Sequence, residues 1–358
     1  MDIHRRVGAV AIIVFAAIAW ASATAAASAA PLFSFPLASP VARPSPSTTP
    51  APPAPSPGAS TDAPALPELS GAHFRTIGMP GAFATLVTGV NDEGALVGVY
   101  YTDKGAKSFG FTGRGRNLAT VNYPGTSGVT SANAINDQGT LVGTYTDATG
   151  TSHGWIRSAD GKFKPLDDPL AASGNGLGTL PYGINSSGVI VGFYVDENNV
   201  AHGFIYNSKS GFTTVDAPAA STAPGLGTVM VSISDSGVIT GTYLDASGVY
   251  HGFVDSQGSF FDFDAPGAGT ESGQGTIPYG ITRRGVVSGW TLHGNNVASG
   301  WLLSGWQFSA LNDPLEAIGP NLGSALYGIN QQGDEAGGEY WDASGHSHGF
   351  VVSLPGSN

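Results

Sequence analysis

The sequence of 358 residues contains no cysteine, and only 11% of its residues are charged. Without cysteine the chain forms no disulfide, and a lipid anchor attached through a cysteine thiol is excluded. The charge content lies well below the roughly 25% usual in globular domains. Lys and Arg number 14 against 26 Asp and Glu, which gives a net charge of −12. This acidity argues against nucleic acid and anionic membrane surfaces as partners, because both require a basic protein face.

Long apolar runs are also lacking. The apolar stretch Val7–Trp20 has 14 residues, whereas a transmembrane helix needs about 20. It follows the basic stretch MDIHRR and precedes small residues that include Ala27–Ala29. This order is typical of a secretory signal peptide, which we place at residues 1–30. The alternative is an uncleaved membrane anchor, since the alanine-rich tail extends the apolar run. The sequence therefore predicts an exported protein, periplasmic or extracellular.

Residues 31–70 consist mainly of Pro, Ser, Ala and Thr. Such a segment cannot bury enough apolar surface to fold, so we predict a disordered, semi-extended linker. The remainder is rich in glycine, of which the chain has 53, and in Thr, Val and Tyr. This composition indicates strands joined by tight turns. We place a folded domain at residues 71–354 and a short tail at residues 355–358.

The folded domain is one repeat, best seen in YGINSSGVIVGFYVD at residues 182–196. A turn glycine marks each of six copies, and successive glycines are 45, 49, 49, 48 and 48 residues apart: Gly94, Gly139, Gly188, Gly237, Gly285 and Gly333. Each copy has four apolar pieces, and its first turn begins with Asn, Ser or Thr and ends with Gly. Four short strands in about 48 residues predict one blade of a β-propeller.

The two ends of the repeat array are complementary. The last copy stops after its third piece, and the missing fourth piece stands at the beginning, at His73–Thr85. A linear solenoid needs terminal caps, whereas a split repeat suits a closed ring. We therefore predict an all-β chain forming a six-bladed β-propeller of four-stranded blades, with the N-terminal strand closing the ring in the last blade.

The repeat resembles the HAF-type bacterial extracellular repeats, whose pattern is GINDxGxIVGxYxDxxGxxHGF. The matching triplets here are HGF at His202, His251 and His348, and HGW at His153. Glycine replaces the alanine of the His-Ala-Phe triplet. The resemblance covers all six copies and implies an exported bacterial repeat protein. It implies no particular activity.

An Asp and a His recur six residues apart in four copies: Asp147 and His153, Asp196 and His202, Asp245 and His251, Asp342 and His348. A structural interpretation makes the Asp a cap of the hairpin turn and the His its partner at the start of the next strand. The alternatives are a binding surface or a metal site. A metal requires three or four converging ligands, and each copy supplies only two. We therefore interpret the pairs as structural and expect no metal and no cofactor.

The repeat is broken in three copies. Phe109 replaces the histidine of copy one, and His293 and Ser299 stand where copy five should have Asp and His. In copy six, Glu335 falls in an apolar position that the other copies fill with Leu96, Leu141, Ile190, Ile239 and Val287. A carboxylate there is costly unless it is paired or solvated. It is either a functional group with Asp334 and Glu339 as neighbours, or the result of one extra residue that lets Glu335 reach solvent.

Three tyrosines precede the glycine of the innermost strand: Tyr182, Tyr279 and Tyr327. One interpretation places them at the mouth of the central channel, beside the Gly-rich crossings, where aromatic rings suit sugars or peptides. The other packs them between blades.

Three classes of function remain open. We rank first a non-enzymatic binding or adhesion module, a monomer with an extracellular glycan or protein ligand on the crossing-loop face. The alternatives are an enzyme acting on extracellular glycans through the polar residues of copies five and six, and a structural surface protein. The sequence contains no nucleophile elbow, phosphate loop or metal-ligand motif. We expect no nucleic-acid binding and no membrane insertion after signal cleavage.

Overall fold

The computed structural model describes residues 66–102, 107–126 and 129–355. These residues form 24 β-strands and no helix, so the all-β prediction is confirmed for the described part of the chain. It follows that no helix in these ranges is long and apolar enough to cross a membrane. The predicted signal peptide, most of the predicted linker and the last three residues of the predicted tail lie outside the described residues.

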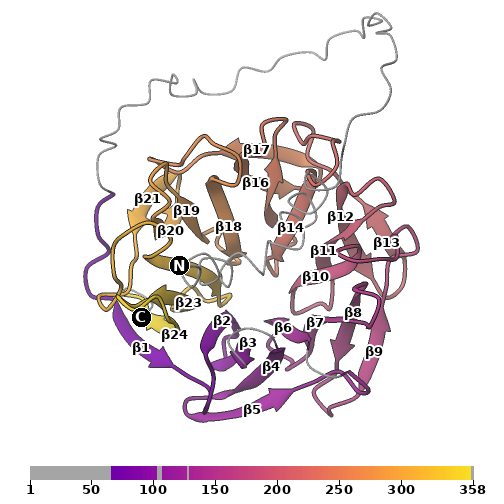
Figure 1. Ribbon diagram of the computed structural model, residues 1–358, viewed down its shortest axis with the longest axis horizontal. Coiled ribbons are helices and arrows are strands. Elements are labelled where there is room, and N and C mark those ends of the chain that lie inside the picture. The colour runs from indigo at the N-terminus through magenta and orange to yellow at the C-terminus, as the bar shows by residue number, and fades with distance from the viewer. Residues whose placement is uncertain (1–65, 103–106, 127–128, 356–358) are drawn as a thin grey trace, which may run out of the picture.

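The strands form six antiparallel units of four, and five of these units are paired in chain order (Figure 1). Unit 1 contains β2 (Ala84–Val90), β3 (Ala95–Thr102), β4 (Lys107–Arg114) and β5 (Asn117–Val121). Unit 2 contains β6 (Thr130–Ile135), β7 (Leu141–Thr146), β8 (Ser152–Arg157) and β9 (Phe163–Leu166). Unit 3 contains β10 (Gly178–Ile184), β11 (Ile190–Val195), β12 (Ala201–Asn207) and β13 (Gly211–Thr214).

The second half of the chain continues the series. Unit 4 contains β14 (Thr228–Ile233), β15 (Ile239–Leu244), β16 (Tyr250–Ser256) and β17 (Ser259–Phe263). Unit 5 contains β18 (Gly275–Ile281), β19 (Val287–Leu292), β20 (Ala298–Ser304) and β21 (Gln307–Ala310). Unit 6 contains β22 (Ser324–Ile329), β23 (Glu335–Trp341), β24 (Ser347–Ser353) and the N-terminal strand β1 (His73–Ile77).

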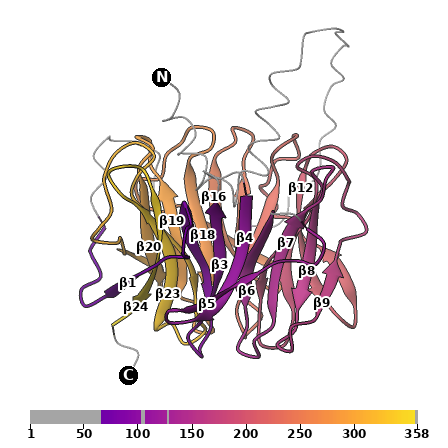
Figure 2. The same ribbon diagram turned by 60° about the horizontal axis from the view of Figure 1, so that its bottom comes forward.

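Neighbouring units also touch through their backbones. A single parallel pair, Gly178 with Ser152, joins units 2 and 3 into one eight-stranded sheet, and Gly275 with Tyr250 joins units 4 and 5. In Figure 1, β2, β6, β10, β14 and β18 lie nearest the centre, while β1, β5, β9 and β13 lie at the periphery. The loops gather at the two ends of the strands (Figure 2).

Strand β1 belongs to unit 6 although it comes first in the chain. It pairs with β24 in antiparallel register from His73 with Ser353 to Ile77 with Gly349. The chain then crosses to β2, which packs against β22, β23 and β24. At the opposite end of the strands, the Gln332 amide donates to Asp92 Oδ1 at 2.8 Å. The first and the last parts of the described chain therefore lie side by side.

The last residues of the predicted linker contact the sheet. The Leu69 amide donates to the Ala310 carbonyl at 3.1 Å, and the Ala310 amide donates to the Pro67 carbonyl at 2.9 Å. Leu66 and Leu69 pack against the apolar clusters of units 5 and 6. These contacts place residues 66–70, which we assigned to the linker, against units 5 and 6, because the two leucines give them apolar surface to bury.

The turn between the first two strands of each unit has the predicted chemistry. In unit 3, Asn185 Oδ1 accepts hydrogen bonds from the amides of Ser187 and Val189 at 3.1 and 3.0 Å. Gly188 closes the turn with a φ of 78°, a left-handed conformation that favours glycine. The same turn glycine has a positive φ in all six units.

A second glycine explains how each unit is packed. A Cβ at Gly241 of β15 would lie 2.2 Å from the Val229 carbonyl oxygen and 2.8 Å from the Phe253 ring. The aromatic ring of the third strand therefore lies directly on a bare backbone in the second strand. The pairing repeats in every unit: Gly98 with Phe111, Gly143 with Trp155, Gly192 with Phe204, Gly241 with Phe253, Gly289 with Trp301, and Gly338 with Phe350.

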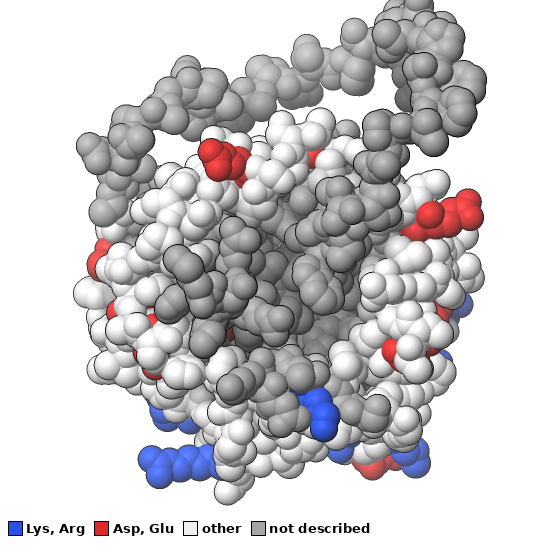
Figure 3. All heavy atoms as spheres, viewed as in Figure 1, with Lys and Arg blue, Asp and Glu red and all other residues white. Residues whose placement is uncertain are grey.

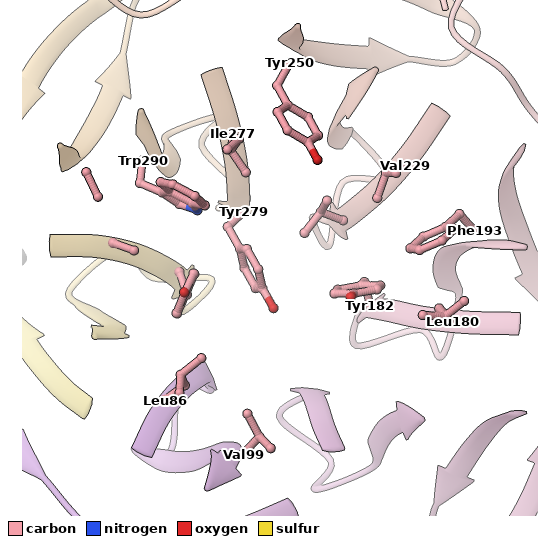
Figure 4. Packing of buried hydrophobic residues seen from close by; sticks show 14 of the residues in the cluster. Leu86, Val99, Leu180, Tyr182, Phe193, Val229, Tyr250, Ile277, Tyr279 and Trp290 are labelled. Carbon is pink, nitrogen blue, oxygen red and sulfur yellow. The ribbon is translucent and has the colours of Figure 1, made fainter. Parts of the chain in front are cut away.

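The centre of the molecule is a closed apolar core (Figure 4). The inner strands supply Leu86, Tyr182, Val229 and Tyr279, all at most 4% exposed. Since burial of one such side chain contributes roughly 1.5–3 kcal/mol, this shared core ties the units together.

Candidate functional site

Each of three histidines links the hairpin between the second and third strands of its unit to the crossing, which is the loop that leads from one unit to the next. His251 Nδ1 contacts both carboxylate oxygens of Asp264 at 3.1 Å, and His251 Nε2 lies 3.6 Å from Asp245 Oδ2. Asp245 Oδ1 accepts hydrogen bonds from the turn amides of Ser247 and Val249. The predicted Asp–His pairs are therefore present and belong to three-residue ties. The equivalent ties are Asp147–His153–Asp167 in unit 2 and Asp196–His202–Asp216 in unit 3.

We did not identify the second carboxylate of each tie from the sequence. Asp167, Asp216 and Asp264 follow the outer strand, and each stands two residues before a proline, which is typical of the end of a strand. Their constant distance of 13 or 14 residues from the histidine was the available signal.

The two carboxylates beside His251 favour its charged form. A carboxylate only accepts hydrogen bonds, and an imidazolium can donate from both ring nitrogens. The hydrogen bond to Asp264 raises the pKa of His251 against the opposing effect of its burial, and the charge of Asp245 adds to the rise. The Tyr243 ring stacks on His251 at a centroid distance of 5.1 Å.

We predict that His251→Ala and Asp264→Ala each destabilise the protein by about 1 kcal/mol, with a smaller effect for the double variant than for the sum. The contribution of the tie is fully present below pH 6.5, the ordinary histidine pKa, and is lost as the pH rises through the higher folded pKa. Denaturant unfolding at pH 6 and pH 9 measures both effects. Asp245→Asn, which keeps the Oδ1 acceptor of the turn, should cost less than Asp245→Ala. Strict additivity of the two alanine substitutions would contradict the tie.

Tyr182, Tyr279 and Tyr327 lie in the central apolar cluster. They are 4%, 3% and 1% exposed, and the rings of Tyr279 and Tyr327 lie 4.7 Å apart. In Figure 4, Tyr182 and Tyr279 extend toward the centre of this cluster. A ligand at these three rings stays a prediction.

Glu335 does not occupy the apolar position that we assigned to it. Ala336, which is fully buried and pairs with Ile329, takes the place that Ile190 has beside Ile184 in unit 3. The extra residue is absorbed in the turn, where the Asn330 amide donates to the Glu335 carbonyl, five residues on instead of four. Glu335 itself is half-buried at the end of β23. The interpretation of one extra residue agrees with this geometry.

The polar residues of units 5 and 6 do not converge. Asp334 accepts a hydrogen bond from Asn330 Nδ2 at 2.5 Å beside the turn, whereas Glu339 lies near the other end of β23. His293 Nδ1 contacts the Gly267 carbonyl oxygen at 2.6 Å, and the Asn296 amide donates to the His293 carbonyl, so this residue anchors its hairpin.

The other two breaks in the repeat are also structural. Ser299 of unit 5 precedes Gly300, whose amide donates to Asn312 Oδ1 at 2.8 Å. Phe109 of unit 1 stacks on Tyr100 at 5.4 Å, in the arrangement that histidine and tyrosine adopt elsewhere.

Glu339 is a fully buried carboxyl group in the central core. Tyr327 Oη donates to its Oε1 at 2.5 Å, and Ser347 Oγ donates to its Oε2. Burial raises the pKa of Glu339 to about 7, although the two hydroxyl donors oppose the rise. This group therefore titrates near neutral pH inside the protein.

Unit 6 differs from units 2, 3 and 4 in the crossing that leaves it. In units 2 to 5 a crossing amide donates to a hydroxyl eleven residues later, as Ala217 does to Thr228. After unit 6 the equivalent bond, from Met79 to Thr85, spans only six residues. The long crossings reach back to the preceding hairpin, as when the Gly225 amide donates to the Asn199 carbonyl. By this measure the crossing from β1 to β2 is five residues shorter than the others, and it does not reach back to the hairpin of unit 6.

A cavity of about 300 Å³ lies where the short crossing leaves the unit 6 hairpin uncovered. We call it the seam cavity; it is lined by residues 76–79, 82–85 and 346–348. Ile77, Met79 and Phe83 give it an apolar side, and the Phe83 ring meets His346 edge-on at 5.5 Å. Thr76, Gly78 and His346 are exposed, so the cavity opens to solvent. Its volume lies at the lower end of the range usual for small-molecule sites.

His348 borders the seam cavity with one of its two ring nitrogens unpaired. Its Nε2 lies 2.9 Å from Asp342 Oδ2, closer than in the other units. Gly78 stands where the crossings of units 2, 3 and 4 carry Asp, and among the described residues Nδ1 has no hydrogen-bond partner. The His348 side chain is 38% exposed, against 22–26% for the histidines of units 2, 3 and 4.

The other end of the strands offers a narrower opening. A cavity of about 50 Å³ is lined there by the turns of several units, with Asp137 and Asp235 among its residues. This volume suits water rather than a ligand. Within the described ranges no three His, Asp or Glu side chains are grouped so as to hold a metal ion.

Charged side chains are scattered over the face shown in Figure 3 and form no continuous patch among the described residues.

No protein-family model and no curated protein sequence matches this chain. Three solved structures resemble it at a distance. A lectin of Aleuria aurantia, described as a six-bladed β-propeller with a novel fucose recognition mode, is 13% identical over 77% of this chain and 93% of its own, with a TM-score of 0.47. AofleA from Arthrobotrys oligospora is 11% identical over 78% and 82%, with a TM-score of 0.46. TolB from Acinetobacter baumannii is 13% identical over 66% and 55%, with a TM-score of 0.47. At these TM-scores the likenesses carry no argument about fold or ligand.

Proposed function

We propose that this chain is an exported, non-enzymatic binding module built as a closed six-bladed β-propeller, with its ligand site in the seam cavity. The observation that carries the proposal is the short crossing of unit 6. Five crossings are described from end to end, and the shortest of them borders a cavity of about 300 Å³ that contains two histidines and a phenylalanine. A departure from an otherwise regular repeat is where a specific function is expected.

The proposal of a closed ring rests on the contacts between the two ends of the array. Strand β1 completes the sheet of unit 6, and β2 packs on that same unit. Export rests on the order of basic, apolar and small residues in residues 1–30, and the resemblance to HAF-type repeats agrees with it. The protein would act as a monomer on a ligand outside the cell.

An enzyme acting on glycans is the weaker candidate. Such enzymes use two carboxyl groups roughly 5–10 Å apart across an open cleft. Glu335 and Glu339 are separated by four residues of extended strand, about 13 Å, and Glu339 is enclosed in the core.

A ligand screen by NMR tests the binding proposal. Small sugars, short peptides and small organic acids are added to the labelled protein, and we expect at least one class to shift the signals of Phe83, His346 and His348 together. Thr76→Trp, at the exposed rim of the cavity, should weaken that binding at least tenfold. Thr214→Trp places the same side chain at the equivalent position of unit 3, where the crossing is long, and should leave binding unchanged. Binding that maps elsewhere, or that survives Thr76→Trp, would exclude the seam cavity as the site.

A further inference from the structure

The ties of units 2, 3 and 4 show what the seam cavity lacks. In each of them a carboxylate from the crossing contacts Nδ1 of the histidine, at 3.1 Å for Asp167 and 2.8 Å for Asp216. The same carboxylate accepts the amide of the following glycine in units 2 and 3. In unit 6 the histidine is present, its first carboxylate Asp342 is present, and the second carboxylate is replaced by Gly78 with a cavity beside it.

The register supports this equivalence. Asp264 follows the pair Phe263 with Gly252, and Asp167 follows the pair Leu166 with Gly154. Gly78 follows the pair Ile77 with Gly349 in the same way. The position of the missing carboxylate is therefore defined by the backbone, next to Nδ1 of His348.

We propose that the seam cavity binds a ligand that combines a carboxylate with an apolar group, and that the ligand carboxylate takes the place of the missing aspartate on His348 Nδ1. The apolar group of the ligand lies against Phe83, Ile77 and Met79, which form the other side of the cavity. This inference rests on the proposed function, since it names the ligand chemistry of the same site.

Binding of such a ligand is coupled to a proton. Asp342 is ionised near neutral pH: burial alone would raise its pKa, but hydrogen bonds from the Ser344 hydroxyl and His348 lower it overall. Its carboxylate can only accept, so His348 Nε2 donates to it. In the neutral ring Nδ1 is then an acceptor, and a ligand carboxylate requires Nδ1 to be protonated. The carboxylate ligand therefore binds the imidazolium form of His348.

The titratable and charged groups around His348 come from several elements. Asp342 contacts it directly, and Asp313 on the preceding crossing interacts with it electrostatically. Tyr340 stacks on the ring at 5.1 Å, and His346 stands across the cavity opening, bonded to the Ser344 hydroxyl. Glu339 lies behind Ser347 in the core. The short crossing itself, residues 76–79 and 82–85, contributes no titratable side chain to the cavity wall.

The test uses phenylacetate and its uncharged counterpart phenylacetamide on the full-length protein, with binding followed by NMR at pH 5.5 and pH 8. We expect phenylacetate to bind at least tenfold more tightly at pH 5.5 than at pH 8 and to shift the ring proton signals of His348. Phenylacetamide should bind more weakly at pH 5.5 and show no such change with pH. A peptide ending in a phenylalanine carboxylate, compared with the same peptide amidated, distinguishes a chain terminus from a free small acid as the source of the carboxylate.

Three variants assign the effect to His348. Gly78→Asp restores the internal carboxylate; a Cβ at Gly78 meets no atom within 4 Å, so the substitution fits. It should weaken phenylacetate binding at least tenfold and raise the melting temperature. His348→Phe keeps the stacking that Phe109 makes on Tyr100 in unit 1 and should abolish the preference for the carboxylate. His251→Phe makes the same substitution in a unit with a long crossing and should leave binding unchanged.

The outcomes separate this inference from the proposed function. If phenylacetamide or a methyl glycoside binds in the cavity as tightly as phenylacetate, or binds more tightly as the pH rises, the carboxylate proposal is wrong and the binding proposal stands. If the pH dependence survives His348→Phe, the assignment to His348 is wrong. If no probe, charged or neutral, shifts the signals of Phe83 and His348, both proposals fail.

Discussion

A chain that begins at Gly78 should unfold at a temperature at least 10 °C lower than a chain that begins at Leu66. The longer chain retains every described residue, and the shorter one lacks β1 and the segment before it. Loss of β1 removes Ile77 and Phe74 from the apolar surface of unit 6 and leaves β24 with an unpaired edge. We estimate a cost of about 5 kcal/mol from the buried apolar side chains and the lost ladder. For a domain of this size each kcal/mol shifts the melting temperature by roughly 2–4 °C.

The matched control begins at Gly71. It lacks the contacts of Leu66 and Leu69 with β21 and unit 6 but retains β1, so its melting temperature should lie close to that of the longer chain. Calorimetry on the three chains measures the contribution of each segment. Equal melting temperatures for the chains beginning at Gly71 and Gly78 would show that β1 does not complete unit 6, and the closed ring would lose its support.

Between pH 5 and pH 8 the protein should lose about 3 kcal/mol of stability through Glu339. Its pKa is about 7 in the folded protein, against an ordinary value of 4.5. Between these values the folded state holds a proton that the unfolded state has released, so the free energy of unfolding falls as the pH rises through this window. Above about pH 7 both states are ionised and the effect is constant. Each pKa unit corresponds to 1.36 kcal/mol.

Glu339→Gln should remove this slope, because the amide can accept from Tyr327 and cannot ionise. Denaturant unfolding at pH 5 and pH 8 gives the difference between the two proteins. Glu197→Gln, the same change on an exposed turn residue, should retain the slope of the unmodified protein. A Glu339→Gln variant with an unchanged slope would show that the carboxyl group is ionised in the core throughout this range.

Local pattern predicted the strands and turns well. Apolar pieces bounded by Asx and Gly predicted the four strands of each unit. The prediction was possible because pairing within a unit joins segments that are close in sequence. The turn at Asn185 and Gly188 follows from backbone chemistry alone. The extra residue beside Glu335, one of the two interpretations that the sequence left open, is absorbed in the turn without moving the strand that follows, and the pairing of Ala336 with Ile329 agrees with it.

The site was less predictable, since it depends on contacts between distant segments. The Asp and His of each hairpin were visible, but the second carboxylate comes from the next crossing. The sequence left two interpretations of the tyrosines open, because their burial depends on which segments meet at the centre. We assigned His73–Thr85 to a single piece and did not distinguish the short crossing after β1.

The sequence by itself determined the strands, the turn chemistry, the Asp–His pairs and the place of His73–Ile77 as the missing fourth piece of unit 6. These features are repeated, and each depends on neighbouring residues or on hydrophobic pattern. Only the tertiary structure decided that Tyr327 and Glu339 share a closed core, and that His348 faces a cavity of about 300 Å³ with Nδ1 unpaired among the described residues. The physical reason is that burial and open space are set by which side chains meet across units, and the sequence of one unit does not specify what its neighbour leaves uncovered.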